Sequence, residues 1–569
     1  KLSVRLNQPV EGCSLEMYTL ARDAGGTIIP KDDERLKYQW FMSRAHSVCA
    51  HAKCPRLQMD KSVRSRLQCL EYVRLGLPPS MSFFCSTECL AAAWKLHKRG
   101  GGELAAAMGG AGVPGATPGT TFHDLEYADG FRELPGPVVS EDWVPIATGR
   151  AFQPHREHVW HKLRLQVTAS TATEAEPLVT SASTKWVLPL PPPAPRRPFI
   201  PVNPAASPHT PPPHVYADGG VDPVQGNRKH PLGLRLMSFN VLAEIYATQS
   251  IYPYCPLWAL RWSYRRQRLV EELKRYDPDI VCLQEVQADH FAADLYPTMA
   301  ELGYEGLYKQ KTREPMGAEG KVDGCALFFR ASRFALLEKY VIEFNDAAMA
   351  ESQKLKNAQP PAARKQQLNM ALHRLLRDNV AQVVLLEMRA DREGNPLASP
   401  ATLCVANTHL FWDPSYADVK LWQTHMLVKE LEKFVLQRSL PLVLCGDFNS
   451  APGSAVHKLL AGNAAGRRSG LSREDLPRDP CNILPGRGKL SHHLCLSSAY
   501  ATAAGSEPGF TNFTGEFTGC LDYVWFTSDC MRVAACLELP DEKTLRGYSG
   551  TALPNPQFCS DHLPLCFDM

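Results

Sequence analysis

The stretch that decides the fold is Pro441-Leu442-Val443-Leu444-Cys445-Gly446-Asp447-Phe448-Asn449-Ser450. Its apolar run from Pro441 to Leu444 is typical of a buried strand, and the run stops at a glycine before a carboxylate and a carboxamide. Side chains two residues apart on an extended chain share one face, so Asp447 and Asn449 can converge on one oxyanion or one metal-bound water. The competing interpretation is that either side chain only caps the next turn.

The same arrangement, a polar residue that closes an apolar strand, recurs at four further places. They are Phe239-Asn240, Leu283-Gln284-Glu285, Asn407-Thr408-His409, and the pair Leu521-Asp522 with Ser560-Asp561-His562. A site at one edge of a sheet sandwich needs polar residues at the ends of several strands. Five such closings therefore predict one shared site rather than five unrelated turn caps.

These motifs resemble the endonuclease/exonuclease/phosphatase superfamily over residues 230 to 569. Within it, they look like the carbon catabolite repressor protein 4 type of poly(A) deadenylase, in its plant and green-algal form. The resemblance is carried by Met237 to Ala243, Tyr252 to Pro256, Tyr264 to Gln267, Cys282 to Val286, Val405 to His409, Phe517 to Tyr523 and Ser560 to His562. It implies a two-sheet α/β sandwich with helices outside and a site formed by loops at one edge.

The activity that the resemblance implies is a Mg²⁺-dependent 3′-5′ exoribonuclease that shortens mRNA poly(A) tails and releases 5′-AMP, as the catalytic subunit of the Ccr-Not complex. It also implies a cytoplasmic location, including mRNA-decay granules, and a nuclear one. Two alternatives stay open. One is a 2′,5′-oligoadenylate phosphodiesterase or nucleotide phosphatase of the same superfamily, and the other is a catalytically silent zinc-finger scaffold.

Glu285 is the first expected ligand of Mg²⁺ or Mn²⁺. A lone carboxylate that closes a buried strand is costly to leave unpaired, and hard divalent cations select oxygen ligands. The alternative is a structural salt bridge. The resemblance adds Asp561 at a second metal position and Asn240 as the residue that orients the first, and it leaves open whether one or two ions bind.

The resemblance also assigns the acid-base chemistry. His562 would carry a proton or bind phosphate, and Asp522 would fix its tautomer by accepting the other ring proton. Asp447 would orient or deprotonate the attacking water, while Asn449 and His409 would donate to the phosphate in the transition state. The alternative for His562 is a core histidine with satisfied hydrogen bonds.

Selection of adenine needs a base pocket, because every nucleotide offers the same phosphate. Pro414 and Phe517 occupy the positions that sandwich the terminal base in the family that the chain resembles. The alternatives are a turn proline and ordinary core packing. The basic tract Tyr264 to Arg268 could touch the RNA backbone, but we expect a solvated helix face.

Cysteine spacing predicts a structural zinc site with four thiolate ligands arranged as two closely spaced pairs: Cys49, Cys54, Cys85 and Cys89. The segment resembles MYND-like fingers, whose interleaved ligands hold two zinc ions. The second site would use Cys69 and His97, but Tyr72 and Gly101 stand where its other two ligands are expected. We therefore predict one intact site and a degenerate second one, against the alternative of buried thiols without metal.

The resemblance implies that this finger binds the second deadenylase subunit of the Ccr-Not complex. No repeat of 20 to 29 residues that would indicate leucine-rich repeats is present. The predicted order is a small β-sandwich at 1–44 and 122–188, the finger inserted at 45–100, a proline-rich linker at 189–231 and the catalytic domain at 232–569.

Composition agrees with a large enzyme of several domains. The chain has 569 residues and a formal net charge of +3, so RNA binding has to come from a local groove. No apolar run is long enough for a transmembrane helix. Four cysteines inside apolar runs, Cys282, Cys325, Cys404 and Cys445, are expected to be buried thiols of a reducing compartment.

Two stripes at helical spacing are expected to pack on the sheets, Leu269 to Tyr276 and Val419 to Phe434. Residues 345 to 378 are expected to form polar helices around Pro360-Pro361.

Overall fold

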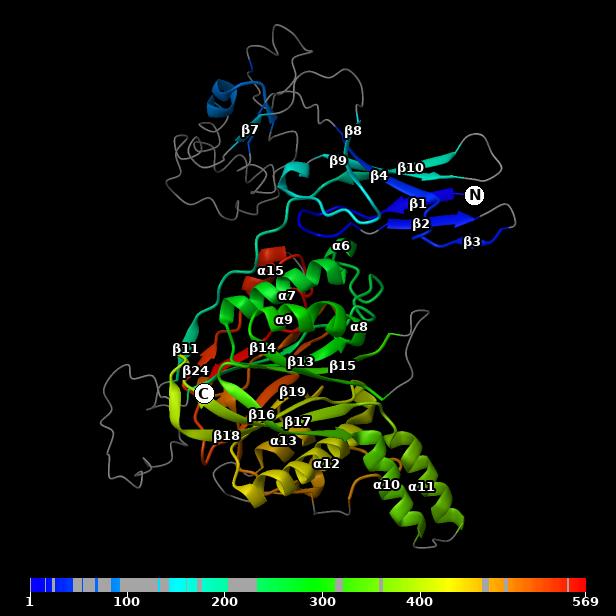
Figure 1. Ribbon diagram of the computed structural model, residues 1–569. Helices are drawn as coiled ribbons and strands as arrows, with labels where there is room; N and C mark the ends of the chain where they lie inside the picture. The colour runs from blue at the N-terminus through cyan, green and yellow to red at the C-terminus, as the bar shows by residue number, and fades with distance from the viewer. Residues whose placement is uncertain are drawn as a thin grey trace. The chain divides into compact units, whose positions relative to one another are not determined.

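The computed structural model describes residues 2–15, 17–22, 26–43, 54, 67–69, 83–92, 131–133, 143–159, 161–170, 177–202, 233–312, 321–357, 362–462, 470–485, 490–549 and 552–569. The chain divides into two compact units, Lys1–Pro193 and Ala194–Met569. All five closing motifs lie in the second unit, which we call the catalytic unit (Figure 1).

In the described part of the catalytic unit, two large sheets carry the fold. The seven-stranded sheet has the order β11 (Phe199–Pro201), β24 (Ala535–Leu537), β25 (Leu565–Asp568), β12 (Arg235–Asn240), β13 (Ile280–Gln287), β15 (Asp323–Arg330) and β14 (Tyr304–Gln310). The six-stranded sheet has the order β16 (Phe334–Glu343), β17 (Val380–Ala390), β18 (Pro396–His409), β19 (Leu442–Asp447), β23 (Asp522–Thr527) and β20 (Leu496–Ser498).

Alternation along the strands sorts the apolar side chains into three layers. In β19, Leu442 and Leu444 pack on the outer face, while Val443 and Cys445 pack between the sheets. In β13, Ile280 lies between the sheets, whereas Val281 faces the other outer layer. Because the period of a strand is two residues, a polar side chain at a strand end points either to the outer face of its sheet or into the space between the sheets.

Helices cover both outer faces, as Figure 1 shows. On the seven-stranded sheet lie α7 (Trp262–Tyr276), the π-helical turn η3 (Phe291–Leu295) and α9 (Tyr296–Glu301). The short helices α6 (Leu257–Leu260) and α8 (Ala288–His290) directly precede α7 and η3 in the chain. On the six-stranded sheet lie α12 (Ala417–Val435), preceded by the short η4 (Pro414–Tyr416), and α13 (Ala455–Ala461). The two predicted stripes are on α7 and α12, and Leu269, Leu273, Val419 and Trp422 are buried. The predicted two-sheet α/β sandwich is confirmed.

The remaining elements lie around this framework. Residues 345 to 378 contain the two expected helices, α10 (Phe344–Asn357) and α11 (Ala362–Leu375), although Pro360 and Pro361 lie outside the described residues. The others are the small hairpin β21 (Asn512–Phe513) and β22 (Thr518–Gly519), with α14 (Ala499–Ala504) and α15 (Glu542–Ser549). The expected buried thiols Cys282, Cys325, Cys404 and Cys445 are buried.

The basic tract of α7 is not a solvated helix face, and that prediction is wrong. Arg265 is only 1% exposed and Arg268 is 4% exposed. The guanidinium of Arg265 donates to the backbone carbonyls of Leu260, Val241 and Cys559 at 2.9, 2.9 and 3.1 Å. Carbonyl oxygens at the ends of three segments thus replace water around this cation, so it can be buried.

The N-terminal unit contains a three-stranded sheet of β1 (Leu2–Leu6), β2 (Met17–Arg22) and β3 (Ile28–Ile29), and a four-stranded sheet in the order β10 (Leu178–Trp186), β9 (Lys162–Ala169), β4 (Leu36–Ser43) and β8 (Trp143–Thr148). Their apolar faces share one cluster around Trp40, Leu163 and Leu165. A third group, β6 (Phe83–Phe84), β5 (Leu67–Cys69) and β7 (Phe131–Glu133), lies in the cysteine-rich region.

The segment predicted as a linker includes β11, which pairs with β24 at the edge of the seven-stranded sheet. The rest of that segment from residue 203 on lies outside the described residues. Within the described residues, no helix is long and apolar enough to cross a membrane.

Candidate active site

The predicted site residues come from strand ends of both sheets. Strands β12 and β13 are parallel, as are β18 and β19, so each pair ends at the same sheet edge. Strand β23 runs antiparallel to β19 and begins there, with Asp522 opposite Asp447. By parity, Asp447 lies on the same face as Val443 and Cys445 and therefore points between the sheets. The two sheets thus bring their polar ends to one place.

A buried triad of Asp447, Asp522 and His562 forms the centre. His562 Nδ1 is 2.7 Å from Asp522 Oδ2, and its Nε2 is 3.7 Å from Asp447 Oδ2. Burial lowers the pKa of His562, but Asp522, Asp561 and Asp447 outweigh it, and the pKa lies well above its ordinary value. Burial and Asp522 raise the pKa of Asp447 to about 7. The centre therefore contains a histidine that stays protonated beside a carboxylate that titrates near neutrality.

Glu285 is held in an unusual backbone conformation. Its φ is 56°, and the pairing of β13 with β15 shifts register between Leu283 and Val286. Left-handed backbone is unfavourable for a residue other than glycine, so surrounding contacts have to hold it. Glu285 Oε1 accepts from Asn240 Nδ2 at 3.1 Å and Oε2 accepts from the Ala243 N–H at 3.0 Å. The bulge directs the carboxylate into the site.

Asn240 joins the two sheets at this point. Its Nδ2 donates to Glu285 and also to Asp447 Oδ2 at 3.0 Å.

Burial, together with Asp561 and Asp323, raises the pKa of Glu285. Carboxylates from different strands are therefore close enough to resist simultaneous ionisation.

Asn449 and His409 form the other wall of the site. Asn449 Nδ2 is 3.0 Å from His409 Nε2 and donates to the Leu410 carbonyl at 3.1 Å, and φ of Asn449 is 47°. Its own N–H donates to Asp447 Oδ1 at 2.8 Å. Asp447 thus has one oxygen engaged by the following turn and the other directed at Asn240, so the turn-capping interpretation describes part of its role.

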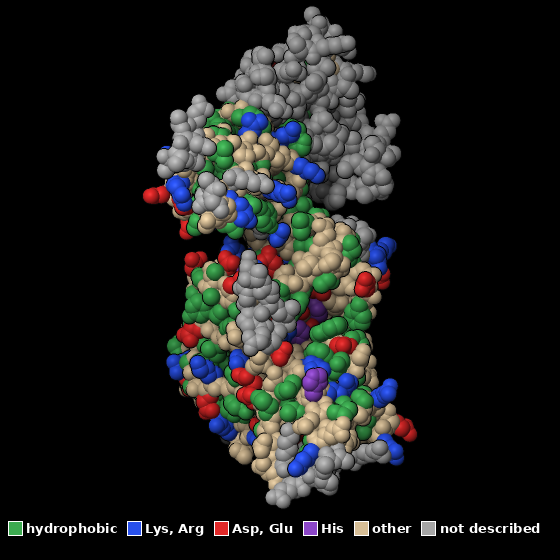
Figure 2. Space-filling view, turned by 90° about the vertical axis from the view of Figure 1, so that its right-hand side faces the viewer, with side chains coloured by type: hydrophobic (Ala, Val, Ile, Leu, Met, Phe, Trp, Pro, Cys, Tyr) green, Lys and Arg blue, Asp and Glu red, His purple; other side chains and the backbone are tan. Residues whose placement is uncertain are grey.

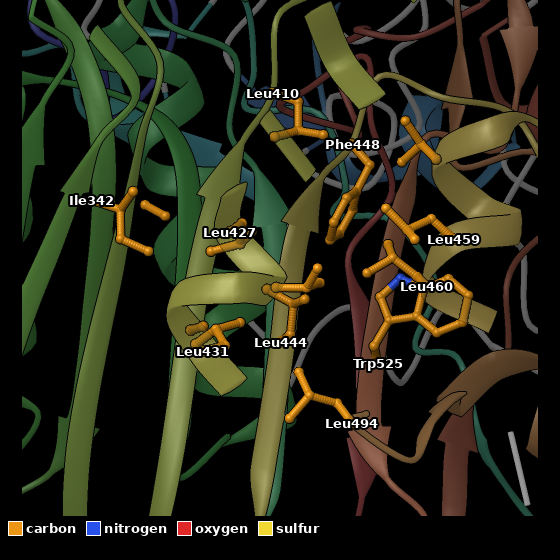
Figure 3. Packing of buried hydrophobic residues seen from close by; sticks show 14 of the residues in the cluster. Ile342, Leu410, Leu427, Leu431, Leu444, Phe448, Leu459, Leu460, Leu494 and Trp525 are labelled. Atoms are coloured by element: carbon orange, nitrogen blue, oxygen red, sulfur yellow. The ribbon is translucent and has the colours of Figure 1, made fainter. Parts of the chain in front are cut away.

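Two features hold the Asp447 loop in place. Phe448 is buried, and Figure 3 shows its ring pointing into the apolar cluster near Leu410 and Leu459. A side chain on Gly446 would collide with the carbonyl oxygen of Thr408 on the neighbouring strand. Glycine at this position lets β18 and β19 approach closely, and the buried ring of Phe448 anchors the turn after Asp447.

Asp561 is held by residues that the sequence interpretation did not assign. Tyr252 OH donates to Asp561 Oδ2 at 2.9 Å, and Asn512 Nδ2 donates to the same oxygen at 3.0 Å. Thr511 Oγ1 donates to Asp522 Oδ2 at 2.6 Å and accepts the Asp522 N–H. Tyr252 lies within a quoted motif, but Thr511 and Asn512 lie in a short hairpin whose sequence carries no strand-closing signal.

A second buried network stands behind Glu285. Lys311 Nζ is 2.7 Å from Asp323 Oδ2, and Tyr246 OH donates to Asp323 Oδ1 at 3.0 Å. Asp561 and Asp323 both raise the pKa of Glu285, whereas Lys311 lowers it. Lys311 and Asp323 escape sequence interpretation because neither belongs to a motif, and charge alone does not identify a partner.

The proposed base-pocket residues lie on the surface. Pro414 begins η4 and is exposed, and Phe517 is 45% exposed at the turn between β21 and β22. Core packing therefore does not explain Phe517. Figure 2 shows acidic and histidine side chains gathered in a recess on one face of the catalytic unit.

The residues present fit a divalent cation. Asp447 and Asp522 offer carboxylate oxygens that lie within 4.8 Å of each other, whereas His562 beside them is protonated and is not available as a ligand. Asp522 Oδ1 is buried with no hydrogen-bond partner among the described residues. Several buried carboxylates with oxygen donors around them are what a hard cation would neutralise. Asp561 lies close enough to Glu285 to raise its pKa, so these two carboxylates suit the same ion.

The cysteine-rich region brings three thiols together. The Sγ atoms of Cys54, Cys85 and Cys89 lie 3.5 to 3.7 Å apart and are buried. Cys85 lies in the bend before a helical segment over residues 87–92, and Cys89 lies in the first turn of that segment. Cys69 belongs to β5, and Cys49 and His97 lie outside the described residues. Three sulfurs at one point fit the geometry of a tetrahedral zinc site with one further ligand.

Comparisons with known proteins agree with the fold of the catalytic unit. Residues 237–562 match the model of the "Endonuclease/Exonuclease/phosphatase family", and the chain belongs to that family. Within it, the chain is of the carbon catabolite repressor protein 4 type. It is 36% identical to carbon catabolite repressor protein 4 homolog 1 of Arabidopsis thaliana over 611 residues, which is 98% of this chain and 95% of the relative.

Two further comparisons each cover about three fifths of the chain. The chain is 33% identical to the CCR4-Not complex 3′-5′-exoribonuclease subunit Ccr4 of Schizosaccharomyces pombe over 360 residues, 59% of this chain and 48% of that protein. The solved structure of ANGEL2, a 2′,3′-cyclic phosphatase, in complex with adenosine-2′,3′-vanadate is 29% identical, with a TM-score of 0.45. It covers 60% of this chain and 99% of that one.

Replacement of Asp447 by Asn should change how stability depends on pH. The folded chain keeps a proton on Asp447 up to a pKa of about 7, whereas the ordinary value is 3.8. The stability that this proton provides is full below the lower pKa and is lost as the pH rises through the higher one. The free energy of unfolding of the wild type should therefore fall, relative to Asp447→Asn, as the pH rises between about 5 and about 7.

Denaturant titrations without added divalent metal measure this difference. Asp529→Asn, an exposed aspartate just after β23, is the control and should run parallel to the wild type. Parallel curves for wild type and Asp447→Asn would show that Asp447 is ionised throughout this range.

Proposed function

We propose that the catalytic unit hydrolyses the 3′-terminal phosphodiester of RNA, removes poly(A) tails one nucleotide at a time and releases 5′-AMP. The observation that carries the proposal is the buried cluster of Asp447, Asp522 and His562 beside Glu285. It combines an acceptor for a proton of water, a protonated histidine and a carboxylate set for a hard cation. The likeness to carbon catabolite repressor protein 4 homologues supports the choice of RNA tails.

Asp447 is the acceptor for the proton of the attacking water. Its pKa of about 7 makes the carboxylate basic enough to take a proton and still ionised in part at neutral pH. The Asn449 N–H engages Oδ1 and leaves Oδ2 facing Asn240 and His562. The bond that forms joins the water oxygen to phosphorus, and the bond that breaks joins phosphorus to the 3′ oxygen of the preceding nucleotide, which takes a proton from solvent and becomes the new 3′ hydroxyl.

Donors on the opposite wall hold the phosphate. Asn449 Nδ2 and His409 Nε2 lie 3.0 Å apart, so both are close enough for one phosphoryl group; Asn449 would donate from Nδ2, and His409 would donate when its ring carries a proton on Nε2. His562 is kept protonated by surrounding carboxylates, and its Nδ1–H donates to Asp522 Oδ2. Nε2 is then the atom that can donate to a phosphoryl oxygen.

Mg²⁺ or Mn²⁺ held by Glu285, Asp561 and Asn240 would neutralise charge that builds on the phosphoryl oxygens. The residues around these ligands prepare their positions. Tyr252 and Asn512 fix one oxygen of Asp561, and Ala243 fixes one oxygen of Glu285. A ligand held by fixed donors loses little further freedom when an ion binds.

Adenine would be held between Pro414 and Phe517. Both are exposed, on segments that leave β18 and join β21 to β22. Exposed rings on fixed turns suit stacking, which tolerates any base, so edge contacts have to add the preference for adenine.

The cysteine cluster would hold one structural zinc ion through Cys54, Cys85, Cys89 and Cys49. We propose that this MYND-like finger is inserted into a small β-sandwich and binds the second deadenylase subunit of the Ccr-Not complex. The similarity to the Arabidopsis relative extends over 98% of this chain, which supports a shared use of the N-terminal unit.

Incubation of the full chain with Mg²⁺ and 5′-labelled RNA should shorten a tail of 3′-linked A and leave tails of C or U and 2′,5′-linked adenylate intact. Glu285→Gln should lower the rate by roughly 100-fold or more, because a charged ligand becomes neutral. Gel analysis of the ladder and detection of 5′-AMP measure the reaction.

Glu305→Gln, an exposed glutamate on β14, is the matched control and should retain full activity. Exclusive cleavage of the 2′,5′ linkage would assign the chain to the alternative phosphodiesterase class. If the wild-type chain cleaves no RNA, or if its cleavage persists in Glu285→Gln, the silent-scaffold alternative would be supported.

Phe517→Ala should reduce kcat/KM on the A tail by about 5-fold to 150-fold, because one stacked base is worth roughly 1 to 3 kcal/mol. Phe517→Tyr should retain most of the activity, since its ring can still stack. Tyr296→Ala, which removes a comparably exposed ring on α9, serves as the control. Unchanged poly(A) shortening by Phe517→Ala would refute the pocket assignment.

Purified full-length chain should contain one zinc ion, and Cys85→Ser should lose it because a thiolate ligand is removed. Elemental analysis with protein quantification measures the ratio. Cys13→Ser changes a buried cysteine outside the cluster and should leave the zinc content unchanged. Wild-type protein without zinc would contradict the site, and two zinc ions would contradict the degenerate second site.

A further inference from the structure

Trp412 is the most exposed large hydrophobic side chain among the described residues. Its exposed fraction is 67%, whereas most tryptophans of a folded chain are largely buried. It stands three residues after His409 and two before Pro414, between the expected phosphate contact and the expected base contact. An exposed indole beside a candidate active site calls for an explanation in terms of a ligand.

The backbone at Trp412 is fixed to the active-site loop. Lys420 Nζ donates to the carbonyl of Trp412 at 3.3 Å and to the carbonyl of Asn449 at 2.7 Å. Lys420 is buried, and burial lowers its pKa. One buried ammonium therefore joins the Trp412 segment to the residue that we expect to bind phosphate.

Hydrogen bonds from the side chains of Gln423 and Asn379 also hold this segment in place. The Phe411 N–H donates to Gln423 Oε1 at 3.1 Å, and Gln423 Nε2 donates to Asn379 Oδ1 at 3.1 Å. Asn379 Nδ2 in turn donates to the His409 carbonyl at 2.9 Å. A backbone held at this many points keeps the Cα of Trp412 in a defined place, so little backbone entropy is lost when a base stacks on its indole.

A cation lies next to this aromatic segment. The Arg377 guanidinium is 5.2 Å from the ring of Phe411 and 4.6 Å from the ring of Tyr416, and the Phe411 ring is 6.2 Å from that of Trp412. Its hydrogen bonds go to the backbone carbonyls of His373 and Leu376. Within the described residues no carboxylate forms an ion pair with Arg377, whereas the neighbouring Arg374 is paired with Asp418.

Surfaces that bind single-stranded nucleic acid combine exposed rings with basic groups along the backbone path. We infer that Trp412 and Arg377, here called the Trp412 platform, bind the RNA upstream of the terminal nucleotide. Trp412 stacks on the base of one of the two nucleotides that precede the terminal one, and Arg377 faces the phosphate backbone. This inference rests on the proposed function and extends the binding site beyond Pro414 and Phe517.

A substrate with an abasic nucleotide tests the stacking directly. The first cleavage step is measured on A-tailed RNA with an abasic nucleotide at the second or third position from the 3′ end, using full-length chain. For the wild type, the abasic nucleotide at the contacted position should lower kcat/KM by roughly 5-fold to 100-fold. Trp412→Ala should show a loss of the same size on intact RNA and no further loss on the abasic RNA.

Trp412→Phe should keep kcat/KM within about 3-fold of the wild type, because a smaller ring still stacks.

Arg377→Gln should lessen the slope of log KM against log salt by about 0.7, which is the value for one lost contact to a single strand. Tyr340→Ala removes an exposed ring on β16 and should change neither measure. Thermal melting identifies any variant that fails to fold, and Trp412→Phe keeps the test valid if Trp412→Ala does.

The inference is overturned if Trp412→Ala has the kcat/KM of the wild type on intact RNA. It is also overturned if the abasic nucleotide lowers kcat/KM by the same factor in the wild type and in Trp412→Ala. Loss of a protein partner by Trp412→Ala with unchanged RNA cleavage also overturns it and would make this surface a protein-docking site. A wild-type chain that does not shorten A-tailed RNA would refute the proposed function itself, which separates the two failures.

Discussion

The position of one sheet against the other depends on the buried side chain of Asn407. This residue belongs to β18 of the six-stranded sheet, yet its Nδ2 donates to the carbonyls of Leu283 and Ala326 in the seven-stranded sheet at 3.0 and 2.9 Å. Its Oδ1 accepts from Gln284 Nε2 at 2.8 Å. Apolar packing between sheets has no direction, whereas these three hydrogen bonds define one relative position.

The candidate active site needs a fixed position of one sheet against the other, because its residues come from both sheets. Asn240 and Glu285 come from the seven-stranded sheet, while His409, Asp447 and Asp522 come from the six-stranded one. Asn240 bonds Asp447 across the boundary at 3.0 Å, and a slip between the sheets would break this contact and separate the carboxylates. Burial of like charges at this boundary costs stability, and protonation of Asp447 and His562 offsets part of the cost in the absence of metal.

The sequence predicts the parts of this arrangement that alternation and strand ends control. The strand over Pro441 to Leu444 and the convergence of the strand-closing motifs follow from a two-residue period. Glu285 is expected from the cost of an unpaired carboxylate, but its left-handed backbone depends on tertiary contacts, for which local sequence carries no signal. Arg265 is missed because two of the three carbonyls that its guanidinium binds, those of Val241 and Cys559, are distant in sequence. The loop residues that hold Asp522 and Asp561 are missed for a similar reason, since their composition is that of ordinary turns: Thr511, Asn512 and Tyr252.

The site divides into a buried part and an exposed part, and the division follows from the chemistry each would perform. Hydrolysis requires groups whose charge is controlled, and Asp447, Asp522 and His562 are almost fully buried, where neighbouring charges act strongly. Recognition of a base requires an accessible ring face, and Phe517 and Trp412 are exposed. Lys420 connects the two parts, since its ammonium bonds the backbone of Trp412 and of Asn449. A base stacked on an exposed ring is thereby tied, through one buried cation, to the position of the residue expected to hold the phosphate.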